Sequence, residues 1–543
     1  MRALSPLFSG SLLVAAFLSG SCAPVAERDE ASASPATSDL RELVLLFTND
    51  VESAIDPVPA FWLEGMPLMG GAPHLQTMID GIREEERAKD NPVFLFDSGD
   101  MFTGLLSRLT LGDVMMEMMV TLDYDAMAIG NHEFDYGSTN FLQKMHRVPF
   151  PVLSANTFWK GTDILYARPH AIVEKDGFRI GVIGVIGQDA MSVVLPSLVA
   201  DLDFRDPIPH VRASVEELEP ITDLIVVLAH QGKTGPMQSD QENDPEVWRD
   251  FEEDIALSTQ VEGIDVLLGG HAHRGIDPPY VNPETGTIIS QTFGHGTRVG
   301  VLRLWVDLRQ GSVERHDGKL VTPWSAEYPA DPLMEGKMAA FKAAFADQIE
   351  PVVGRLEGRL TRKYRRESTL GSFVADVLRE SMSADVGITN AGGLRADLAG
   401  GDVSLGAIRD ALPFLNSVVK VEMTGAQLVE VLEQGFSLER GMIQVSGLAA
   451  QIDLEREIGQ RIVDLKVGGK PIDPSRTYSV STNSFLAEGG DLYETFVGLE
   501  WVEHDERTLA EVVIAAFESA EGAFPVPEPG RIVRVGEVEL DEG

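Results

Sequence analysis

The stretch LVLLFTNDVE, residues 43–52, joins a continuous apolar run to polar residues that can bind a metal ion. Residues 43–47 are all apolar, which is typical of a strand that is buried on both faces of a sheet. Asp50 and Glu52 follow that run almost at once. In α/β sheets ligands bind where strands end at the carboxyl edge. The stretch therefore predicts a strand of a layered α/β domain with functional groups at its end.

The same arrangement recurs along the chain up to about residue 324, where short apolar runs alternate with polar, helix-like stretches. Further runs lie at residues 93–96, 126–129, 180–186, 224–228 and 266–268. Four of these runs are followed closely by the side chains that we single out as possible metal ligands or their neighbours: Asp97 and Asp100, then Asn131, His132 and Asp135, then His230, then His271 and His273. We expect one edge of the sheet to gather these groups from distant points of the chain.

The residue types suit a centre with two metal ions. Two divalent ions about 3.5–4 Å apart need a bridging carboxylate together with oxygen and imidazole ligands. Such a pair binds a phosphate, neutralises its charge and generates hydroxide from water near neutral pH. A single Asp after a strand is usually a helix cap, and a single His is usually a hydrogen-bonded polar residue. Five such strand ends in succession argue against coincidence.

Over residues 43–303 this order resembles the calcineurin-like metallophosphoesterases, with GNHE at 130–133 and GHAH at 270–273 both intact. The resemblance implies an α/β, four-layer domain with mixed sheets and two divalent ions, Mn²⁺, Zn²⁺ or similar. It implies that Asp50, Glu52, Asp100 and His273 hold one ion, and that Asp100 bridges to a second ion held by Asn131, His230 and His271. His132 and Asp135 match the catalytic pair. His132 would stabilise the transition state or protonate the leaving oxygen, and Asp135 would orient its ring.

One position departs from that family, which usually has Asp-x-His where this chain has Asp50-Val51-Glu52. A carboxylate can replace imidazole as a ligand, but it lowers the net positive charge of the centre. We therefore predict a less acidic bridging water and a preference for harder ions such as Mn²⁺. The alternative is that Glu52 points away and the first site is incomplete.

The C-terminal half begins after a predicted linker helix over residues 332–350, which Pro351 ends. A second α/β (α+β) domain then starts near Arg359, with helical patterns at 371–379 and 425–434 and a strand-like run at 386–389. Four motifs stand out in this domain: NAGGLR at 390–395, PFLN at 413–416, QVSG at 444–447 and NSFLAEGGD at 483–491. Glycines let backbone approach a ligand, and an Arg beside them can meet phosphate or ribose oxygens. Phe414 and Phe485, in predicted loops, could sandwich a flat base, although core packing is the commoner fate of Phe.

Together these motifs resemble the C-terminal domain of the 5'-nucleotidase family, which includes the bacterial UDP-sugar hydrolases, over residues 359–535. The resemblance implies a nucleoside pocket on a domain that rotates to deliver substrate to the metals. Matched by motif, Phe414 and Phe485 would stack the base and Asp491 would hold ribose hydroxyls. Asn390 and Arg395 would contact base, ribose or phosphate.

A second departure lies before this pocket, because Tyr364 stands where the family often has an Arg. Arg365 or Arg366 could supply the missing positive charge. The aromatic pair is retained, so a nucleotide or another small phosphate ester remains the expected partner.

The charge and the cysteine content of the chain exclude further classes of protein. Asp and Glu number 85 against 44 Lys and Arg, a formal net charge of -41 that argues against nucleic-acid binding. The one cysteine, Cys22, excludes an internal disulfide and a cysteine zinc cluster. An apolar stretch precedes LSGSC at 18–22, which resembles a bacterial lipobox. We expect export to the periplasm or cell surface with a lipid on Cys22; the alternative is an ordinary cleaved signal.

The predicted organisation follows from these patterns. It comprises a signal peptide at 1–22, a flexible tether at 23–40, the metallophosphoesterase domain at 41–325, a linker helix at 326–355, the substrate-binding domain at 356–537 and an acidic tail at 538–543. The expected activity is that of a two-metal 5'-nucleotidase. One alternative is hydrolysis of UDP-sugars, 2',3'-cyclic nucleotides or other esters, sulfur substrates included, on the same scaffold. Another is a surface-binding protein with a decayed catalytic centre, which Glu52 and Tyr364 favour.

Overall fold

The structure is a computed structural model that describes residues 40–60, 63–233 and 251–535. The predicted signal peptide, the tether up to residue 39 and the acidic tail lie outside these residues. None of the helices that the structure describes is long and apolar enough to cross a membrane.

The N-terminal half is built on two six-stranded sheets. The first has the order β16-β15-β1-β4-β5-β6, and its strands β1, β4, β5 and β6 are parallel to one another. These strands span β1 (Leu40–Thr48), β4 (Val93–Asp97), β5 (Ala126–Ala128), β6 (Val152–Leu153), β15 (Val299–Asp307) and β16 (Ser312–Val321). Because β15 and β16 run antiparallel at the edge, the sheet is mixed.

The second sheet has the order β13-β14-β12-β11-β9-β8. Its strands span β8 (His170–Lys175), β9 (Phe178–Ile186), β11 (Leu224–Gln231), β12 (Val266–His271), β13 (Tyr280–Val281) and β14 (Ile288–Ser290). The four central strands are parallel, so β9, β11, β12 and β14 end at the same edge. Every apolar run predicted as a strand is a strand in this half.

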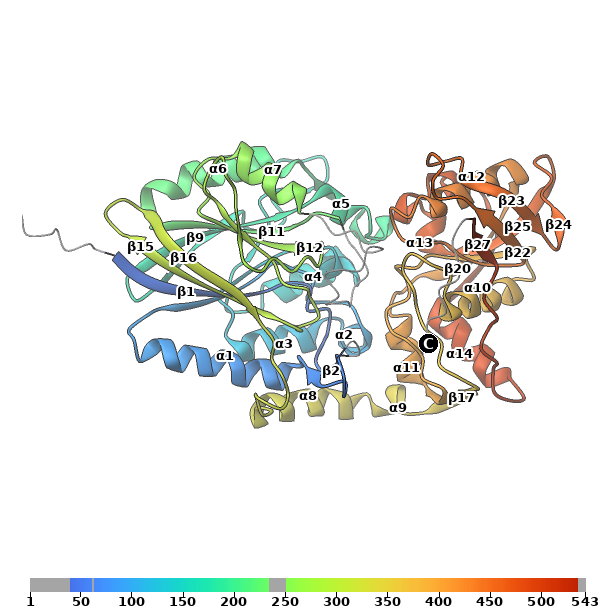
Figure 1. Ribbon diagram of the computed structural model, residues 1–543, viewed down its shortest axis with the longest axis horizontal. Coiled ribbons are helices and arrows are strands. Elements are labelled where there is room, and N and C mark those ends of the chain that lie inside the picture. Colours follow the sequence, from blue (N-terminus) through green and yellow to red (C-terminus); the bar gives the residue numbers. More distant parts are fainter. Residues whose placement is uncertain (1–39, 61–62, 234–250, 536–543) are drawn as a thin grey trace, which may run out of the picture. The chain divides into compact units, whose positions relative to one another are not determined.

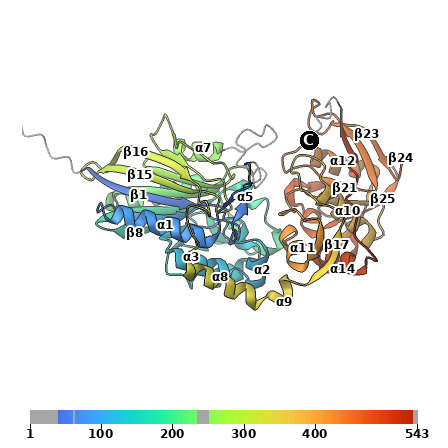
Figure 2. The same ribbon diagram turned by 60° about the horizontal axis from the view of Figure 1, so that its bottom comes forward.

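The two sheets pack face to face and helices cover both outer faces. Alternate residues of β1 show why: Leu43, Leu45 and Phe47 pack between the sheets, whereas Val44 and Leu46 pack on the outer side. Helices α1 (Ala72–Arg87) and α3 (Asp113–Leu122) cover the first sheet, and α6 (Pro207–Leu218) and α7 (Glu252–Gln260) cover the second. Figures 1 and 2 show these layers. The four-layer α/β fold predicted from the sequence is therefore confirmed.

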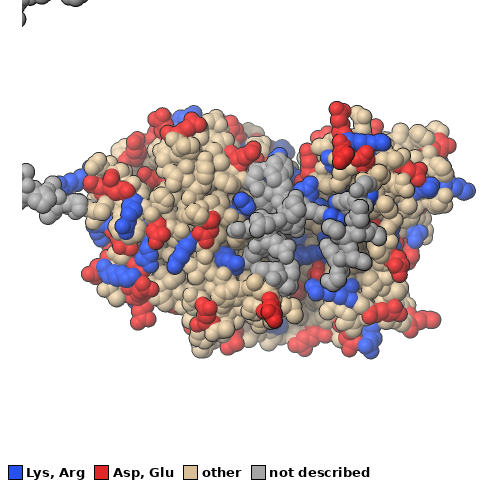
Figure 3. Space-filling view, in the orientation of Figure 1, with Lys and Arg blue, Asp and Glu red and all other residues tan. Residues whose placement is uncertain are grey.

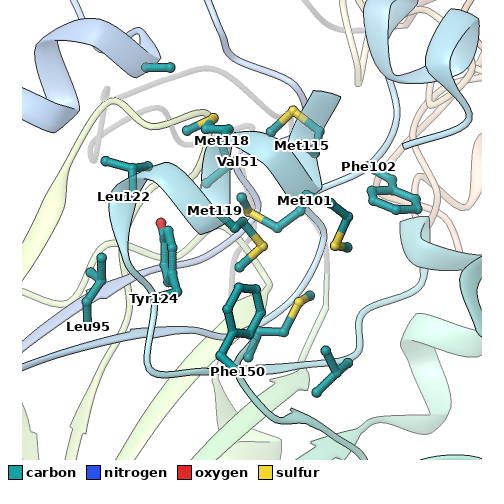
Figure 4. Packing of buried hydrophobic residues seen from close by; sticks show 14 of the residues in the cluster. Val51, Leu95, Met101, Phe102, Met115, Met118, Met119, Leu122, Tyr124 and Phe150 are labelled. Carbon is teal, nitrogen blue, oxygen red and sulfur yellow. The ribbon is translucent and has the colours of Figure 1, made fainter. Parts of the chain in front are cut away.

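A methionine-rich part of the core anchors one of the functional loops. Met115, Met118 and Met119 of α3 lie beside Met101 and Phe102, which directly follow Asp100 (Figure 4). All five side chains are fully buried. Flexible thioethers fill irregular space well, so this cluster holds the loop after β4 in place.

The C-terminal half contains a five-stranded sheet of order β21-β18-β25-β20-β26. Its strands span β18 (Val386–Thr389), β20 (Ser417–Thr424), β21 (Gln444–Ser446), β25 (Thr477–Asn483) and β26 (Trp501–Thr508). One core cluster joins it to α10 (Thr369–Ser381), α11 (Leu405–Ala411) and α14 (Leu509–Ser519), and a second to α12 (Gly425–Phe436) and a four-stranded sheet. That sheet consists of β22 (Leu448–Ile452), β23 (Ile462–Val467), β24 (Lys470–Pro471) and β27 (Ile532–Arg534). The helices and the strand predicted in this half are thereby confirmed.

The predicted single linker helix is wrong in one respect. Two helices occupy the segment, α8 (Pro332–Ala344) and α9 (Ala346–Ile349), with a break at Phe345 where φ is -121° and ψ 18°. Phe345 packs against the core of the N-terminal half, as do Met334 and Met338. Tertiary packing of Phe345 thus outweighs the helical pattern. After the second helix, β17 (Val352–Leu356) pairs with β19 (Gly401–Ser404).

Charges of both signs are present on the surface that one view shows. On the face shown in Figure 3, Lys and Arg side chains lie among Asp and Glu side chains. Several basic groups of the described residues are held in pairs, such as Lys175 with Asp125 and Arg531 with Asp376.

Candidate metal centre and substrate site

The loops that follow the strands share an unusual backbone conformation. Five predicted ligands, Asp50, Glu52, Asp100, His271 and His273, have φ between 46° and 65°. Residues other than Gly rarely adopt this left-handed region, and those that do cluster at functional sites. The strained backbone therefore marks these strand ends independently of the residue types.

The first group of side chains gathers around His273. Its Nε2 lies 3.4 Å from Oδ1 of Asp50 and 3.4 Å from Oε1 of Glu52. Glu52 therefore points into the cluster, and the alternative that it points away does not match the structure. The two Asp50 oxygens also accept the backbone N–H of His271, each at 3.0 Å, which ties the loop after β1 to the end of β12.

The second group lies on the other side of Asp100. Nε2 of His230 is 3.1 Å from Oδ2 of Asp100 and 3.1 Å from Oδ1 of Asn131. The rings of His230 and His271 lie with centroids 5.1 Å apart. The ligand atoms of Asp100, His230 and His271 lie within 4.8 Å of one another, and so do those of Asp100, Glu52 and His132. A carboxylate in that position suits a bridge between two ions.

Two features of the structure indicate that these residues can hold divalent ions. Among the described residues, Oε1 of Glu52 and Nδ1 of His273 are buried and have no hydrogen-bond partner. Buried polar atoms are normally paired. A mixed set of carboxylate, amide and imidazole donors is one that Mn²⁺, Zn²⁺ and Co²⁺ accept. The backbone also approaches closely, because a Cβ at Gly130 would lie 2.3 Å from Oδ1 of Asp100.

Glu133, which the sequence reasoning did not single out, holds two of the ligand loops together. Its buried carboxylate accepts backbone N–H groups from Gly130 at 2.7 Å, Asp100 at 2.9 Å and Met101 at 2.8 Å. The signal was present as the last residue of the GNHE motif. Only the fold shows that it fixes the spacing of the loops after β4 and β5.

The predicted catalytic pair is in contact. Nδ1 of His132 lies 3.1 Å from each oxygen of Asp135, and its Nε2 faces the cluster, 4.0 Å from Oδ2 of Asp100. Burial opposes protonation, but the carboxylates of Asp135, Asp100 and Glu52 raise the pKa of His132 to about 9. The ring is therefore oriented by one carboxylate and able to carry a proton on the nitrogen that faces the cluster.

Two further contacts orient the imidazoles of the second group. Nδ1 of His230 lies 2.8 Å from the carbonyl oxygen of Ser98, and Nε2 of His271 lies 3.3 Å from Oδ2 of Asp189. Asp189 was missed because it follows the apolar run at 180–186 by three residues, on the short helix α5 (Gln188–Met191). Partners on the outer nitrogen of a His are typical of metal sites.

Two of the four motifs of the C-terminal half, NAGGLR and NSFLAEGGD, meet at Asp491. Asn390 donates to Oδ2 of Asp491 at 2.6 Å, and Asn483 lies 3.4 Å from Oδ1 of Asn390. Burial raises the pKa of Asp491 to about 6, although the positive charge of Arg440 opposes the rise. A carboxylate with one oxygen bound by an amide is suited to accept hydroxyl groups on the other.

The two predicted stacking rings differ from each other. Phe414 is half-buried in a loop, and its ring stacks on His132 with centroids 5.9 Å apart and an angle of 19°. Phe485 is not in a loop as expected: it lies in the short helix α13 (Ser484–Ala487), only 7% exposed, with its ring against Gly490. The NSFLAEGGD motif begins a helix because the side chain of Asn483 caps it by accepting the N–H of Leu486. Both rings nevertheless line one cavity.

Arg395 reaches from the C-terminal half to the predicted metal ligands. It donates to Oε2 of Glu52, and its Cζ lies 5.7 Å from the centre of the Phe414 ring. A cavity of about 1410 Å³ is lined by groups from both halves, including His132, Asp100, Asn390, Phe485 and Asp491. Tyr364, Arg365 and Arg366 also line it. The structure thus brings the predicted substrate residues and five of the seven predicted metal ligands to one cavity; Asp50 and His230 are fully buried and are not among its lining residues.

The fold and the site together define the class of metal-dependent phosphoesterases. The fold is a four-layer α/β domain, and the site has carboxylate, amide and imidazole groups at the strand ends with a His–Asp pair beside them. Comparison with known families agrees. Residues 43–275 match the calcineurin-like phosphoesterase family, and residues 352–498 match the 5'-nucleotidase C-terminal domain. The two matches together take in well over half of the chain.

Relatives match most of the length of this chain. The chain is 29% identical to the trifunctional nucleotide phosphoesterase protein YfkN of Bacillus subtilis over 86% of its own length, but it spans only 33% of that protein. It is 28% identical to protein UshA of Escherichia coli, covering 77% of this chain and 81% of UshA. The crystal structure of a 5'-nucleotidase precursor from Thermus thermophilus matches 92% of this chain and all of that one, with 28% identity and a TM-score of 0.79.

The chain belongs to the 5'-nucleotidase family of metal-dependent phosphoester hydrolases, in which a calcineurin-like phosphoesterase domain precedes a 5'-nucleotidase C-terminal domain. The domain boundaries given from the sequence stay predictions.

Proposed function

We propose that this protein is a two-metal 5'-nucleotidase, which hydrolyses the phosphate ester of 5'-nucleotides to a nucleoside and phosphate. The observation that carries the proposal is the shared cavity, whose lining combines the cluster around Asp100 with the polar pair Asn390–Asp491. A phosphate at the cluster and a nucleoside at the pair would occupy one continuous space.

The ligand roles follow the two groups of side chains. Asp50, Glu52, Asp100 and His273 would hold one ion, and Asp100, Asn131, His230 and His271 the other. When bound, the ions would neutralise the phosphate charge and lower the pKa of water. With a carboxylate at Glu52, Mn²⁺ is the expected preference.

The remaining residues act on the leaving group and the nucleoside. His132, oriented by Asp135 at 3.1 Å, would donate the proton from Nε2 to the departing 5'-oxygen. Phe414 would stack on the base, an interaction of about 1–3 kcal/mol that tolerates different bases. Asp491 would accept the ribose hydroxyls through the oxygen that Asn390 does not occupy. A broad range of nucleotides is therefore expected.

The contact between His132 and Asp135 supports an enzyme rather than a surface-binding protein with a decayed centre. Export as a periplasmic or cell-surface lipoprotein, anchored through Cys22, is part of the proposal. Its support is the sequence pattern at residues 18–22. Mass spectrometry of membrane-extracted protein tests it, and an unmodified Cys22 in that protein would contradict the anchor.

Phosphate release from a substrate panel tests the activity. The panel comprises AMP, UMP, ATP, UDP-glucose, 2',3'-cyclic AMP and p-nitrophenyl phosphate, each with Mn²⁺, Zn²⁺, Mg²⁺ and Co²⁺. We expect the highest kcat/KM with nucleoside 5'-monophosphates. Turnover of p-nitrophenyl phosphate without turnover of nucleotides would overturn the proposal. A preference for UDP-glucose or the cyclic nucleotide would instead support the related activities on this scaffold.

A further inference from the structure

A histidine outside the ligand set described above lies against the first metal group. His295 stands between Gly294 and Gly296 in the loop after β14, the next strand of the sheet beyond β12. Its Nε2 is 3.9 Å from Oε2 of Glu52, and its ring centroid is 5.6 Å from that of His273. The loop after β14 thus reaches the same carboxylate as the loops after β1 and β12.

The backbone holds this loop in place. The N–H of His295 donates to the carbonyl oxygen of Asp50 at 2.6 Å, and φ of His295 is 51°, the left-handed conformation shared by the predicted ligands. A Cβ at Gly294 would lie 2.6 Å from Nδ1 of His273. Only a glycine there lets the loop come this close to the metal group.

One side-chain atom of His295 and one of Glu52 are left without a hydrogen-bond partner among the described residues. Within the described part of the chain, Nε2 of His295 and Oε1 of Glu52 are buried and have no hydrogen-bond partner. The side chain of Glu52 is 2% exposed and that of His295 is 14% exposed. Leaving a buried imidazole nitrogen and a buried carboxylate oxygen unpaired is costly unless the two atoms bind something.

The spacing suits one ion. The ligand atoms of Glu52, His273 and His295 all lie within 4.8 Å of one another. An ion bound at about 2.0–2.2 Å places its ligands up to about 4.4 Å apart, so small side-chain shifts suffice. Arg395 occupies Oε2 of Glu52, which leaves Oε1 for the ion.

We propose that His295 is a ligand of the first divalent ion, which it shares with Glu52 and His273. The inference rests on the metal centre of the proposed function, but not on the substrate assigned there. An ion that accepts mixed oxygen and nitrogen donors, such as Mn²⁺, Co²⁺ or Zn²⁺, is the one this site takes. The chain then offers an imidazole from a loop that the strand-end motifs at 130–133 and 270–273 do not include.

The test is metal binding by the full chain after chelator treatment. His295→Gly removes the imidazole and tolerates the left-handed backbone, and His295→Asn keeps that tolerance with a shorter side chain. The exposed His146→Ala is the matched control. Mn²⁺ titration calorimetry should show one of two dissociation constants raised at least about tenfold in both His295 variants and unchanged in the control. The absorption spectrum of bound Co²⁺ should lose intensity in both His295 variants and not in the control.

Each outcome decides between the proposals. Unchanged Mn²⁺ constants and Co²⁺ spectra in folded His295 variants would overturn the role of His295, and so would a wild-type chain that binds no divalent ion. Failure of the nucleotidase proposal is seen separately. In that case the wild type would bind both ions, and His295→Gly would weaken the binding of one of them. The wild type would nevertheless release no phosphate from nucleotides.

Discussion

Arg440 donates both terminal nitrogens to the two oxygens of Asp189, at 2.8 and 2.6 Å. Oδ2 of Asp189 also lies 3.3 Å from Nε2 of His271, so one carboxylate joins the C-terminal half to a predicted metal ligand. Burial opposes ionisation, but the contacts with His271 and Arg440 lower the pKa of Asp189 to about 2. The carboxylate is therefore charged at neutral pH and able to orient the imidazole.

Loss of Asp189 is expected to weaken one metal site. A carboxylate on the outer nitrogen of a metal-binding His is worth about 10–100-fold in affinity. Asp189→Ala should therefore raise one Mn²⁺ dissociation constant by about that factor, and Arg440→Met should have a smaller effect in the same direction. Isothermal titration with Mn²⁺ measures both. Asp163→Ala, whose side chain is 96% exposed, is the control, and wild-type affinity in Asp189→Ala would refute the orienting role.

Removal of the catalytic imidazole should separate turnover from metal binding. His132→Ala is expected to lower kcat by about 10²–10⁴-fold, the usual contribution of a positioned general acid. Asp135→Asn should cost less, because the ring remains but loses the carboxylate 3.1 Å from Nδ1. Elemental analysis should find as much bound metal as in wild type. A fall in metal content that matches the fall in kcat would assign His132 to metal binding instead.

The two phenylalanines should respond differently to truncation. Phe414 is half-buried, so Phe414→Ala is expected to raise KM for nucleotides while p-nitrophenyl phosphate is hydrolysed as before. Phe485 belongs to a core cluster, and Phe485→Ala should cost about 3–5 kcal/mol of stability. Steady-state kinetics and thermal melts distinguish the two. Phe485→Leu keeps most of the apolar volume and is expected to destabilise the protein less than Phe485→Ala. Equal losses of activity on both substrates in Phe414→Ala would argue against stacking.

Asp265 should make stability depend on pH. Its carboxylate accepts the N–H of Ile225 at 2.8 Å, and burial, with some repulsion from Glu219, raises its pKa to about 6. An unfolded Asp titrates near about 3.9, so the folded chain binds the proton more tightly and loses stability as pH rises from about 4 to 6. Asp265→Asn keeps the acceptor without the charge. It should gain at most about 3 kcal/mol over wild type at pH 7 and little at pH 4.

Urea unfolding of both proteins at pH 4 and pH 7 measures this difference. The same stability offset at the two pH values would show that Asp265 has an ordinary pKa. Thr285→Ala, in the turn between β13 and β14, is a control that leaves ionisable groups unchanged.

Much of the metal-centre geometry was predictable because its signals are local. Parallel strands buried on both faces appear as continuous apolar runs, and the side chains at their carboxyl ends, such as Asp50 after β1 and His230 in β11, gather at the edges of the two packed sheets and not at one sheet as the sequence had suggested. His295 escaped this reasoning because β14 has three residues and ends five residues before it. Glu133 and Asp189 escaped it because their roles consist of contacts to distant backbone or side chains.

The sequence by itself determined the layered fold, the strand ends where ligands gather and the residue types of the catalytic pair, because strand burial and motif spacing depend on neighbouring residues. Only the tertiary structure decided that Glu52 points into the cluster and that Arg395 contacts Glu52 although 343 residues separate them. It also decided that Phe485 lies in a short helix with its side chain buried. The direction of a side chain depends on which other segments fold against it. That information is spread over both halves of the protein and is present in no single stretch.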